Sequence, residues 1–516
     1  MSEPPRAALV GQSRTGGKEV LSSVVFSLLY PLLARFASYA GIRYPGGQCE
    51  GCKIAKPGTR ETARGSGPVN WERMTMDRRG FLEGTSSVVG AAAVGSVLSS
   101  PAAGRSANDR VTVCVMGVRG RGGNLLTTFT SLPDVDIKYV CDLDENVLNA
   151  RTAQVEAKRG RKPQAIKDYR TALDDKSVDA IISGCPDHWH ALPTIHACQA
   201  GKDVYVEKPD GHNVMEGRTM VAAARKYQRV TQMGTQGRSG LHHRRAIDYI
   251  ATGKLGKVRF AKAWESSRQG PVGPVPDSAA PSTVDYNTWL GPAPVRPFNR
   301  FRFHGHWRWF FDYGTGDLGN DGVHRLDMAR WALETAVQAQ GEKIPRVPRA
   351  VSAHGGKYYF DDMQEFPDTL MVTYDYPGYV LTYEMRIWNR YPLHGESEGS
   401  AVYGDAGYVV IGNRGWRAYD ERGKEVIAET GTDNSIGHAR DFIDCMRSRE
   451  KCHADLETVG HPSSLLCHLG NAAWRAGRTL KFDPETYTVR DDPDANQYLV
   501  RTEYRKPWVL PSLAQL

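Results

Sequence analysis

Between residues 110 and 233 the chain alternates short apolar runs with stretches of helical length. The apolar runs are rich in β-branched residues and have the length of buried strands. The predicted strands are residues 110–116, 135–141, 180–183, 204–207 and 230–233, and the helices between them include 190–200 and 214–227. This alternation predicts a doubly wound parallel sheet, in which ligands lie at the carboxyl ends of the strands.

The second half of the chain has a different pattern, in which several strands precede two helices. Strands are predicted from Val258 and at 350–353, 369–375, 380–388 and 400–411, and helices at 438–447 and 462–479. Residues 270–300 hold seven prolines, so we expect an ordered arm there rather than a strand or a helix. A polar tail is expected to follow the last helix.

The composition is that of a folded, enzyme-sized protein. With 516 residues, 40% hydrophobic and 24% charged, the chain is long enough for two or three domains. Residues 1–107 hold 13 Lys and Arg against 7 Asp and Glu, which leaves +2 of the net +8 for residues 108–516. We therefore expect no nucleic-acid partner. Seven of the nine cysteines lie in the body without a repeated spacing, so no disulfide framework is expected.

A tripartite leader precedes the body. Asp77-Arg78-Arg79-Gly80-Phe81-Leu82 is followed by a Gly- and Ala-rich stretch to Leu98 and by small residues at 100–102. The arginine pair resembles a twin-arginine export signal, whose pathway carries folded proteins, so we expect a periplasmic protein. The alternative is a Gly/Ala-rich helix after two arginines in a cytoplasmic protein. The run at 24–33 is too short to span a bilayer, and no membrane-spanning helix is expected in the mature chain.

The first predicted strand runs into a glycine-rich turn of the kind that cradles a pyrophosphate. Gly117 and Gly122 match the first and third glycines of GxGxxG. Arg119 stands in the second place, unless Gly120 takes it through a shifted turn. We expect Arg119 to help hold the pyrophosphate.

An acidic residue follows the second predicted strand. Asp142 lies 20 residues beyond Gly122, where a carboxylate binds the ribose hydroxyls and repels a 2′-phosphate. The sequence therefore predicts NAD, with NADP less favoured. The alternative is that Asp142 caps a helix and Asp144 is the ribose acid.

Two further strand ends carry distinctive motifs. Cys185-Pro186-Asp187-His188-Trp189-His190 follows one strand, and Glu207-Lys208-Pro209 ends the next after an Ala-Gly-Lys turn. At these motifs the sequence resembles the Gfo/Idh/MocA oxidoreductase family, over about residues 108–485. The resemblance implies an N-terminal Rossmann domain and a second domain built on an open, largely antiparallel sheet with helices. One face of that sheet often forms oligomers in the family, so a homo-oligomer is implied.

The resemblance also implies roles for residues. In the family the lysine of the triplet lies beside the nicotinamide and the substrate hydroxyl, so Lys208 is the expected catalytic ammonium. The alternative is a Glu-Lys pair on a solvated turn. The expected cofactor-binding residues are Gly117, Arg119, Gly120, Gly122, Asp142, Cys185, Pro186, His190, Glu207, Lys208 and Gln236.

A helical pattern after residue 319 would place Asn320, His324 and Asp327 on adjoining faces. The family pattern is an Asp four residues before a His that acts as general acid/base, so this role maps onto His324. The family Asp maps onto Asn320, which cannot take a proton. Asp321 points about 100° away on a helix and is an imperfect substitute.

Aromatic and basic side chains gather just before this helix. Pyranose rings stack on aromatic faces, although such residues also fill cores between domains. The expected substrate-binding residues are His304, His306, Trp307, Arg308, Trp309 and Asp327. A metal site made from His304, His306, His324 and Asp327 has a spacing that matches no metal signature, so no metal is expected.

Together these features predict an exported, NAD-dependent oxidoreductase that acts on a secondary hydroxyl of a sugar, polyol or glycoside. The predicted parts are an extension at 1–75, a signal peptide at 76–107, a Rossmann domain at 108–236, a substrate and oligomerisation domain at 237–485 and a tail at 486–516. One alternative is a redox-neutral enzyme that uses bound NAD transiently to cleave a glycosidic bond. The other is a catalytically silent protein that binds a dinucleotide and a sugar.

Overall fold

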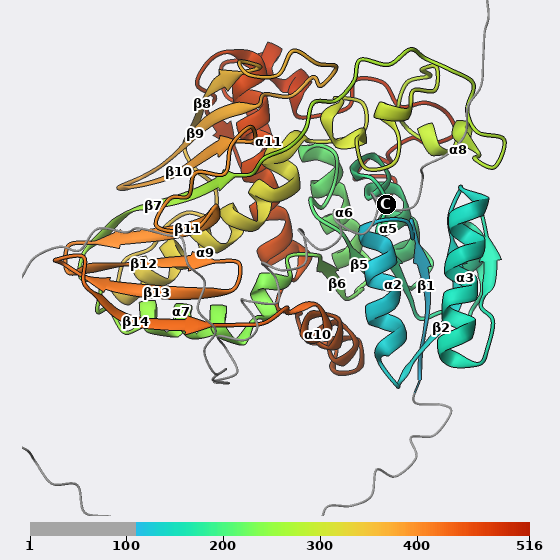
Figure 1. Ribbon diagram of the computed structural model, residues 1–516, viewed down its shortest axis with the longest axis horizontal. Coiled ribbons are helices and arrows are strands. Elements are labelled where there is room, and N and C mark those ends of the chain that lie inside the picture. The colour runs from blue at the N-terminus through green and yellow to red at the C-terminus, as the bar shows by residue number, and fades with distance from the viewer. Residues whose placement is uncertain (1–109) are drawn as a thin grey trace, which may run out of the picture. The chain divides into compact units, whose positions relative to one another are not determined.

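The structure, a computed structural model, describes residues 110–516. The predicted signal peptide and the extension before it lie outside the described residues. Two large sheets, of six and eight strands, organise the described part (Figure 1). Within residues 110–516, no helix is both long enough and apolar enough to cross a membrane.

The first sheet is parallel throughout, with the strand order β3-β2-β1-β4-β5-β6. Its strands are β1 (Val111–Met116), β2 (Val135–Cys141), β3 (Gln164–Ile166), β4 (Ala180–Ser183), β5 (Asp203–Val206) and β6 (Thr231–Met233). Every residue of β4, β5 and β6 is buried, because helices cover both faces. The strand order changes direction between β1 and β4, which opens a crevice at their carboxyl ends. The prediction of a doubly wound parallel sheet is confirmed.

Helices from distant parts of the chain cover this sheet. The local helices are α2 (Arg121–Ser131), α3 (Glu145–Arg159), α4 (Arg170–Asp174), α5 (Ala191–Gln199) and α6 (Val214–Lys226). Helix α10 (Ser435–Ser448) returns to the face that α2 and α3 cover (Figure 1). There Phe129 of α2, Tyr205 of β5 and Phe442 of α10 form a cluster of edge-to-face rings.

The second sheet has the order β14-β13-β12-β11-β7-β10-β9-β8. It is antiparallel except between β7 and β10, so the predicted open, largely antiparallel sheet is confirmed. Its strands are β7 (Val258–Ser266), β8 (Ala350–Gly356), β9 (Thr369–Tyr376), β10 (Tyr379–Arg386), β11 (Glu398–Gly404), β12 (Gly407–Gly412), β13 (Gly415–Asp420) and β14 (Glu425–Thr430). The helices that pack against it are α7 (Leu241–Ala251), α9 (Val323–Ala339) and α11 (His461–Ala476).

The sequence prediction was wrong in two places within this sheet. The single strand predicted at 400–411 is a hairpin of β11 and β12, because Asp405 and Ala406 make a turn between two apolar halves. The hairpin of β13 and β14 was not predicted at all. β14 is exposed along nearly its whole length, so it lacks the apolar pattern of a buried strand.

The arm and the tail both pack onto the body. The arm at 270–300 is irregular, as expected, except for the five-residue helix α8 (Tyr286–Leu290), which was not predicted. The tail is also more ordered than its polar composition indicates. It contains β16 (Thr488–Val489), which pairs with β15 (Phe482–Asp483), and the short helix η8 (Pro493–Tyr498), and its last residue, Leu516, is buried.

Candidate dinucleotide and substrate site

The glycine turn after β1 brings α2 very close to the sheet. Gly117 has φ +69°, and its N–H donates to Cys141 O at 2.9 Å. A Cβ at Gly122 would lie 1.9 Å from Gly117 O, and a Cβ at Gly184 would lie 2.4 Å from Gly122 Cα. Only glycine fits at these close approaches. Gly120, the residue before α2, instead faces open space, since a Cβ at this position would have no heavy atom within 4 Å.

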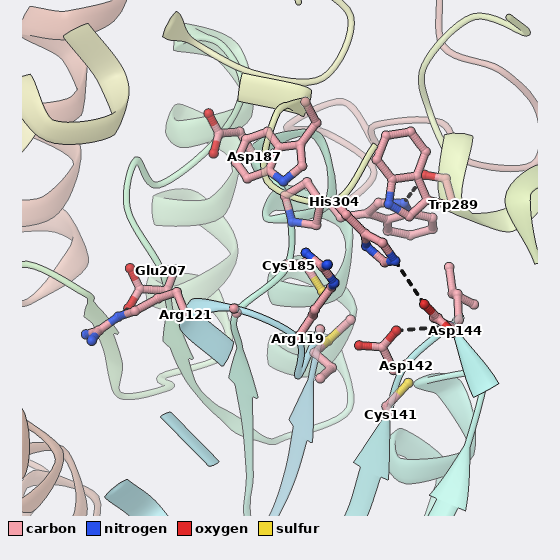
Figure 2. A pocket seen from close by; sticks show the side chains of 18 of the residues that line it. Arg119, Arg121, Cys141, Asp142, Asp144, Cys185, Asp187, Glu207, Trp289 and His304 are labelled. Carbon is pink, nitrogen blue, oxygen red and sulfur yellow. Dashed lines mark hydrogen bonds and ion pairs between the residues drawn. The ribbon is translucent and has the colours of Figure 1, made fainter. Parts of the chain in front are cut away.

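A cavity of about 350 Å³ lies at the carboxyl ends of the parallel strands (Figure 2). It opens in front of the N-terminus of α2, where free backbone N–H groups favour an anion. Most of the predicted site residues line it. These are Gly117, Arg119, Gly120, Asp142, Cys185, Pro186, Glu207, Lys208, His304, Trp307, Arg308 and Asn320.

Asp142 and Asp144 have separate tasks in the loop after β2. Asp142 accepts from the N–H of Val118 at 2.8 Å and of Asp144 at 3.0 Å, and burial raises its pKa. Asp144 caps α3 by accepting from Asn146 N, and its other oxygen lies 2.9 Å from His304 Nε2 (Figure 2). The N-cap of α3 is therefore Asp144, and Asp142 carries its carboxylate into the cavity wall.

A chain of polar contacts crosses the cavity from the glycine turn to the second domain. Arg121, the first residue of α2, donates to Glu207 Oε1 at 2.7 Å (Figure 2). Burial raises the pKa of Glu207, but the nearby charges of Arg121 and Lys208 outweigh burial and bring the pKa below its ordinary value. Lys208 Nζ donates to Asn320 O at 2.6 Å and to Asn320 Oδ1 at 3.0 Å.

Behind Asn320 lies a group of three carboxyls, of which the sequence indicated only Asp321. Asn320 Nδ2 donates to Asp317 Oδ1 at 3.1 Å, and carboxylate oxygens of Asp317, Glu265 and Asp321 lie within 4.8 Å of one another. Burial, followed by the charge of Asp321, raises the pKa of Asp317 to about 6. Burial also raises the pKa of Glu265 well above its ordinary value. Asn320 thus contacts one titratable carboxyl, that of Asp317, and two more lie beside that carboxyl.

The backbone around Asn320 differs from the expected α-helix. Residues Leu318–Gly322 form a π-turn, η6, and α9 begins only at Val323. The wider turn changes the facing of residues four apart, so the expected arrangement of Asn320 and His324 on one α-helix was wrong. Asp321 lies in the carboxyl group with Glu265 and Asp317.

His324 is half-buried and lies outside the cavity lining. Burial, and then the charge of Lys208, lowers its pKa well below the ordinary value. Its imidazole is therefore neutral at pH 7. Among the nearby charges, that of Lys208 lowers the pKa of His324 most.

The structure does not bring the remaining predicted residues into the cavity wall. His190 ties two loops together, with its ring nitrogens 2.6 Å from Pro209 O and 2.8 Å from Cys185 O. Asp327 is buried in an ion pair with Arg238 at 2.8 Å. Trp309 is buried, in line with the alternative that residues of the aromatic cluster fill a core. The other residues outside the lining are Gly122, Gln236 and His306.

Several cavity residues were missed by the sequence analysis. Trp189 lies inside the Cys185–His190 motif, and Phe303 directly precedes His304. Trp289 comes from the proline-rich arm and Arg170 from the start of α4. Trp508 comes from the C-terminal tail, where no sequence signal pointed to the site.

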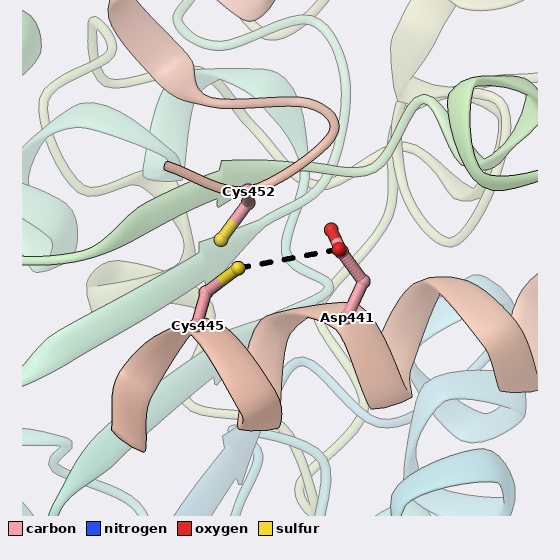
Figure 3. A group of neighbouring side chains, drawn as sticks. All are labelled: Asp441, Cys445 and Cys452. Carbon is pink, nitrogen blue, oxygen red and sulfur yellow. Dashed lines mark hydrogen bonds between the residues drawn. The ribbon is translucent and has the colours of Figure 1, made fainter. Parts of the chain in front are cut away.

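Two groups of described residues offer metal-ligand atoms within 4.8 Å of one another. One is the carboxyl group behind Asn320. The other joins Asp441 and Cys445 of α10 to Cys452 of the following loop, with Cys445 Sγ 4.0 Å from Asp441 Oδ1 (Figure 3). Neither group contains a residue of the alternative metal site that was considered from the sequence.

Known proteins match part of this chain in sequence. A glycosyl hydrolase family 109 protein of Shewanella baltica (strain OS185) is 26% identical over 206 residues, which is 36% of this chain and 45% of the relative. The chain thus spans less than half of that relative's length.

Known structures share the fold at lower identity. Aldose-aldose oxidoreductase from Caulobacter crescentus, complexed with glycerol, is 19% identical with a TM-score of 0.55, over 72% of this chain and 100% of that one. A levoglucosan dehydrogenase in complex with NADH and levoglucosan is 16% identical with a TM-score of 0.55, over 72% and 99% of the two chains.

Family models match most of the described chain. Residues 111–235 match the NAD-binding Rossmann fold of an oxidoreductase family, and residues 259–344 and 424–510 match its C-terminal alpha/beta domain. Together the matches cover more than half of the 516 residues. The first match ends just after β6, and the second resumes in β7 and includes α10 and α11. The chain belongs to the Gfo/Idh/MocA family of oxidoreductases.

Proposed function

We propose that this protein is an NAD-dependent oxidoreductase that acts on a secondary hydroxyl of a sugar, polyol or glycoside. The observation that carries the proposal is the position of Lys208. Its ammonium lies in the cavity wall, on the same sheet edge as the glycine turn, and is held by two hydrogen bonds to Asn320. An ammonium there would polarise a carbinol oxygen and take part in its proton transfer.

The residues around the glycine turn fit a dinucleotide. The open space beside Gly120 leaves room for a pyrophosphate at the N-terminus of α2, and Arg119 lines the same space. Asp142 keeps acceptor capacity beside its two backbone donors, as ribose binding requires. When bound, NAD would supply the hydride acceptor for the reaction.

The preference for NAD would depend on the Asp142 carboxylate, which would repel the 2′-phosphate of NADP. We expect Asp142→Ala to narrow the ratio of the NAD and NADP dissociation constants by about tenfold, because one charge-assisted contact is lost. Titration of both cofactors into wild type and variant measures this ratio. An unchanged ratio would assign the preference to Asp144 or to another loop.

The other side of the cavity would receive the carbohydrate. Trp307 offers an aromatic face and Arg308 offers hydrogen-bond donors. The Nε2 of His304 is instead engaged by Asp144. His324 makes no side-chain hydrogen bond to another described residue, and its lowered pKa keeps it neutral, so it would serve as a base.

A second candidate is the redox-neutral cleavage of a glycosidic bond with transient use of bound NAD. It is favoured by the similarity to a glycosyl hydrolase family 109 protein, which covers 36% of this chain. Both candidates would use the same lysine and the same hydroxyl. They differ in whether NADH accumulates.

The test is to incubate the purified protein with NAD and with separate panels of sugars, polyols and aryl glycosides. Accumulation of NADH absorbance with a sugar or polyol, lost in Lys208→Ala, is the expected result. Release of aglycone without NADH would favour the second candidate. If every compound is left unchanged although NAD binds, the protein is the silent binding protein and both enzymatic candidates fail.

A further inference from the structure

The C-terminal tail returns to the first domain and is fastened there by several side chains. Tyr504 Oη donates to Glu216 Oε1 of α6 at 2.9 Å, and Arg505 Nε donates to Gly291 O at 2.8 Å. Arg505 also donates to Asn287 Oδ1 of the arm at 2.6 Å. The tail thus joins α6 to the proline-rich arm, and its position beside the cavity is fixed on both sides.

Between these attachments and the C-terminus, Trp508 enters the cavity wall. Its ring centroid lies 4.9 Å from that of Trp189, at an interplanar angle of 72°. The guanidinium carbon of Arg170 lies 5.2 Å from the centroid of the Trp508 ring. Trp508 is only half-buried, so part of the indole stays free to contact a ligand.

The strand order places Trp508 on one side of Lys208. Arg170 follows β3, the edge strand beside β2, and Asp142 follows β2. Lys208 follows β5, which three strands, β2, β1 and β4, separate from β3. Trp189, the other ring partner of Trp508, follows β4, so both contacts place Trp508 on the β3 side of Lys208, the side on which Asp142 also lies.

We propose that Trp508 is a further cofactor-binding residue and that its indole packs against the adenine of the bound dinucleotide. The inference rests on the proposed function, because it assumes that a dinucleotide occupies this cavity. A purine offers a flat π-face to the indole. Stacking of a base on an aromatic side chain stabilises a complex without requiring hydrogen bonds to the polar groups of the base. Arg170, which forms an ion pair with Asp168 at 2.7 Å, would contact the polar edge of the adenine in the same subsite.

The experiment compares three ligands that share parts of the cofactor. They are NAD, ADP-ribose, which lacks nicotinamide, and nicotinamide mononucleotide, which lacks adenine. We expect Trp508→Ala to weaken NAD and ADP-ribose about 10- to 100-fold in isothermal titration, and to change the affinity for nicotinamide mononucleotide less than about twofold. Trp508→Phe, which keeps an aromatic face, should recover most of the loss.

A matched control is Leu513→Ala, which truncates an exposed apolar side chain of the same tail. It should leave all three affinities unchanged. Equal weakening of ADP-ribose and nicotinamide mononucleotide in Trp508→Ala would mean that the tail only supports the fold, and would overturn the inference. Unchanged ADP-ribose affinity, or a loss seen only for a sugar substrate, would also overturn it. If wild type binds neither NAD nor ADP-ribose, the proposed function itself fails, which is a distinct result.

Discussion

At the scale of single residues, the site depends on how an amide holds an ammonium. Asn320 accepts from Lys208 through both its backbone and its side-chain oxygen, and it donates to Asp317 through its amide nitrogen. An Asp at this position would form an ion pair with Lys208. The Asn320 amide instead bridges Lys208 and the buried carboxyl of Asp317. The departure from the family pattern therefore leaves a titratable group not at position 320 but in the side chain next to it, Asp317.

The first prediction concerns the ammonium itself. Lys208→Ala removes the group that would polarise the carbinol oxygen, so we expect kcat to fall at least about 100-fold, or about 2.7 kcal/mol of transition-state stabilisation. The affinity for NAD should change little, because the other cofactor contacts remain. Steady-state kinetics and NAD titration measure the two effects, with the exposed Lys343→Ala as control. Turnover within tenfold of wild type would remove Lys208 from the chemistry.

The second prediction concerns the carboxyl behind the amide. The pKa of Asp317 is raised from 3.8 to about 6, so between these pH values the folded protein keeps a proton that the unfolded chain has lost. This group therefore makes folding less favourable as the pH rises through that window, and the cost is complete above pH 6. Asp317→Asn removes the cost and keeps an oxygen that can accept from Asn320.

We expect the melting temperature of Asp317→Asn, relative to wild type, to increase between pH 4 and pH 7. Thermal unfolding at several pH values measures it, and Asp248→Asn, at an exposed acid of α7, is the control. A difference that stays constant with pH would show that Asp317 titrates in the folded protein as it does in the unfolded chain.

At the scale of elements, two positions of the glycine turn differ in role. Gly122 allows close packing, and Gly120 would leave space for the ligand. Gly122→Ala would press a methyl group against Gly117 O, so we expect a loss of about 1–3 kcal/mol of stability from overpacking. Gly120→Ala points into open space and should leave stability unchanged, while weakening NAD binding because the methyl group would occupy the pyrophosphate space. Chemical denaturation and NAD titration separate the two effects. Reduced stability in Gly120→Ala, or normal stability in Gly122→Ala, would contradict this division.

Elements that are apolar on both faces could be predicted closely from the sequence. β2 and β4 have the predicted bounds: β4 is buried at every position, and β2, although it carries Asp136 and Lys138, is buried at its other five positions. The strand-turn-helix order then placed Gly117 and Asp142 at one sheet edge. Lys208 and Cys185 followed by the same topology, since parallel strands end at the same edge.

Other features depend on contacts that local sequence does not carry. The π-turn at Leu318–Gly322 has a single large apolar residue, Leu318, so apolar periodicity carries no information on its backbone. The contact of Trp508 with Trp189 joins residues more than 300 positions apart in the chain. The carboxyl group likewise depends on tertiary packing, because β7 supplies Glu265 and the residue just before η6 is Asp317.

At the scale of the whole molecule, segments distant in sequence surround the cavity. The arm supplies Trp289, the tail supplies Trp508, and the loop before η6 supplies Arg308. A dinucleotide bound there would contact all three segments, so its release would break contacts with each of them. Under the proposed function this arrangement favours a cofactor that stays bound through many turnovers, which an exported enzyme would need where free NAD is scarce.

We therefore expect protein purified without added nucleotide to carry close to one NAD(H) per chain after extensive dialysis. Arg119 should contribute to retention, because a charge-assisted contact to the pyrophosphate is worth about 1.5–3 kcal/mol, or about 10- to 100-fold in affinity. Denaturing the dialysed protein and assaying the released nucleotide measures retention, with Arg119→Ala expected to lose most of it. The control is Arg422→Ala, since Arg422 lies on an exposed turn after β13. An empty wild-type protein with freely reversible NAD binding would contradict retention, and would favour a dehydrogenase that exchanges its cofactor in the cytoplasm.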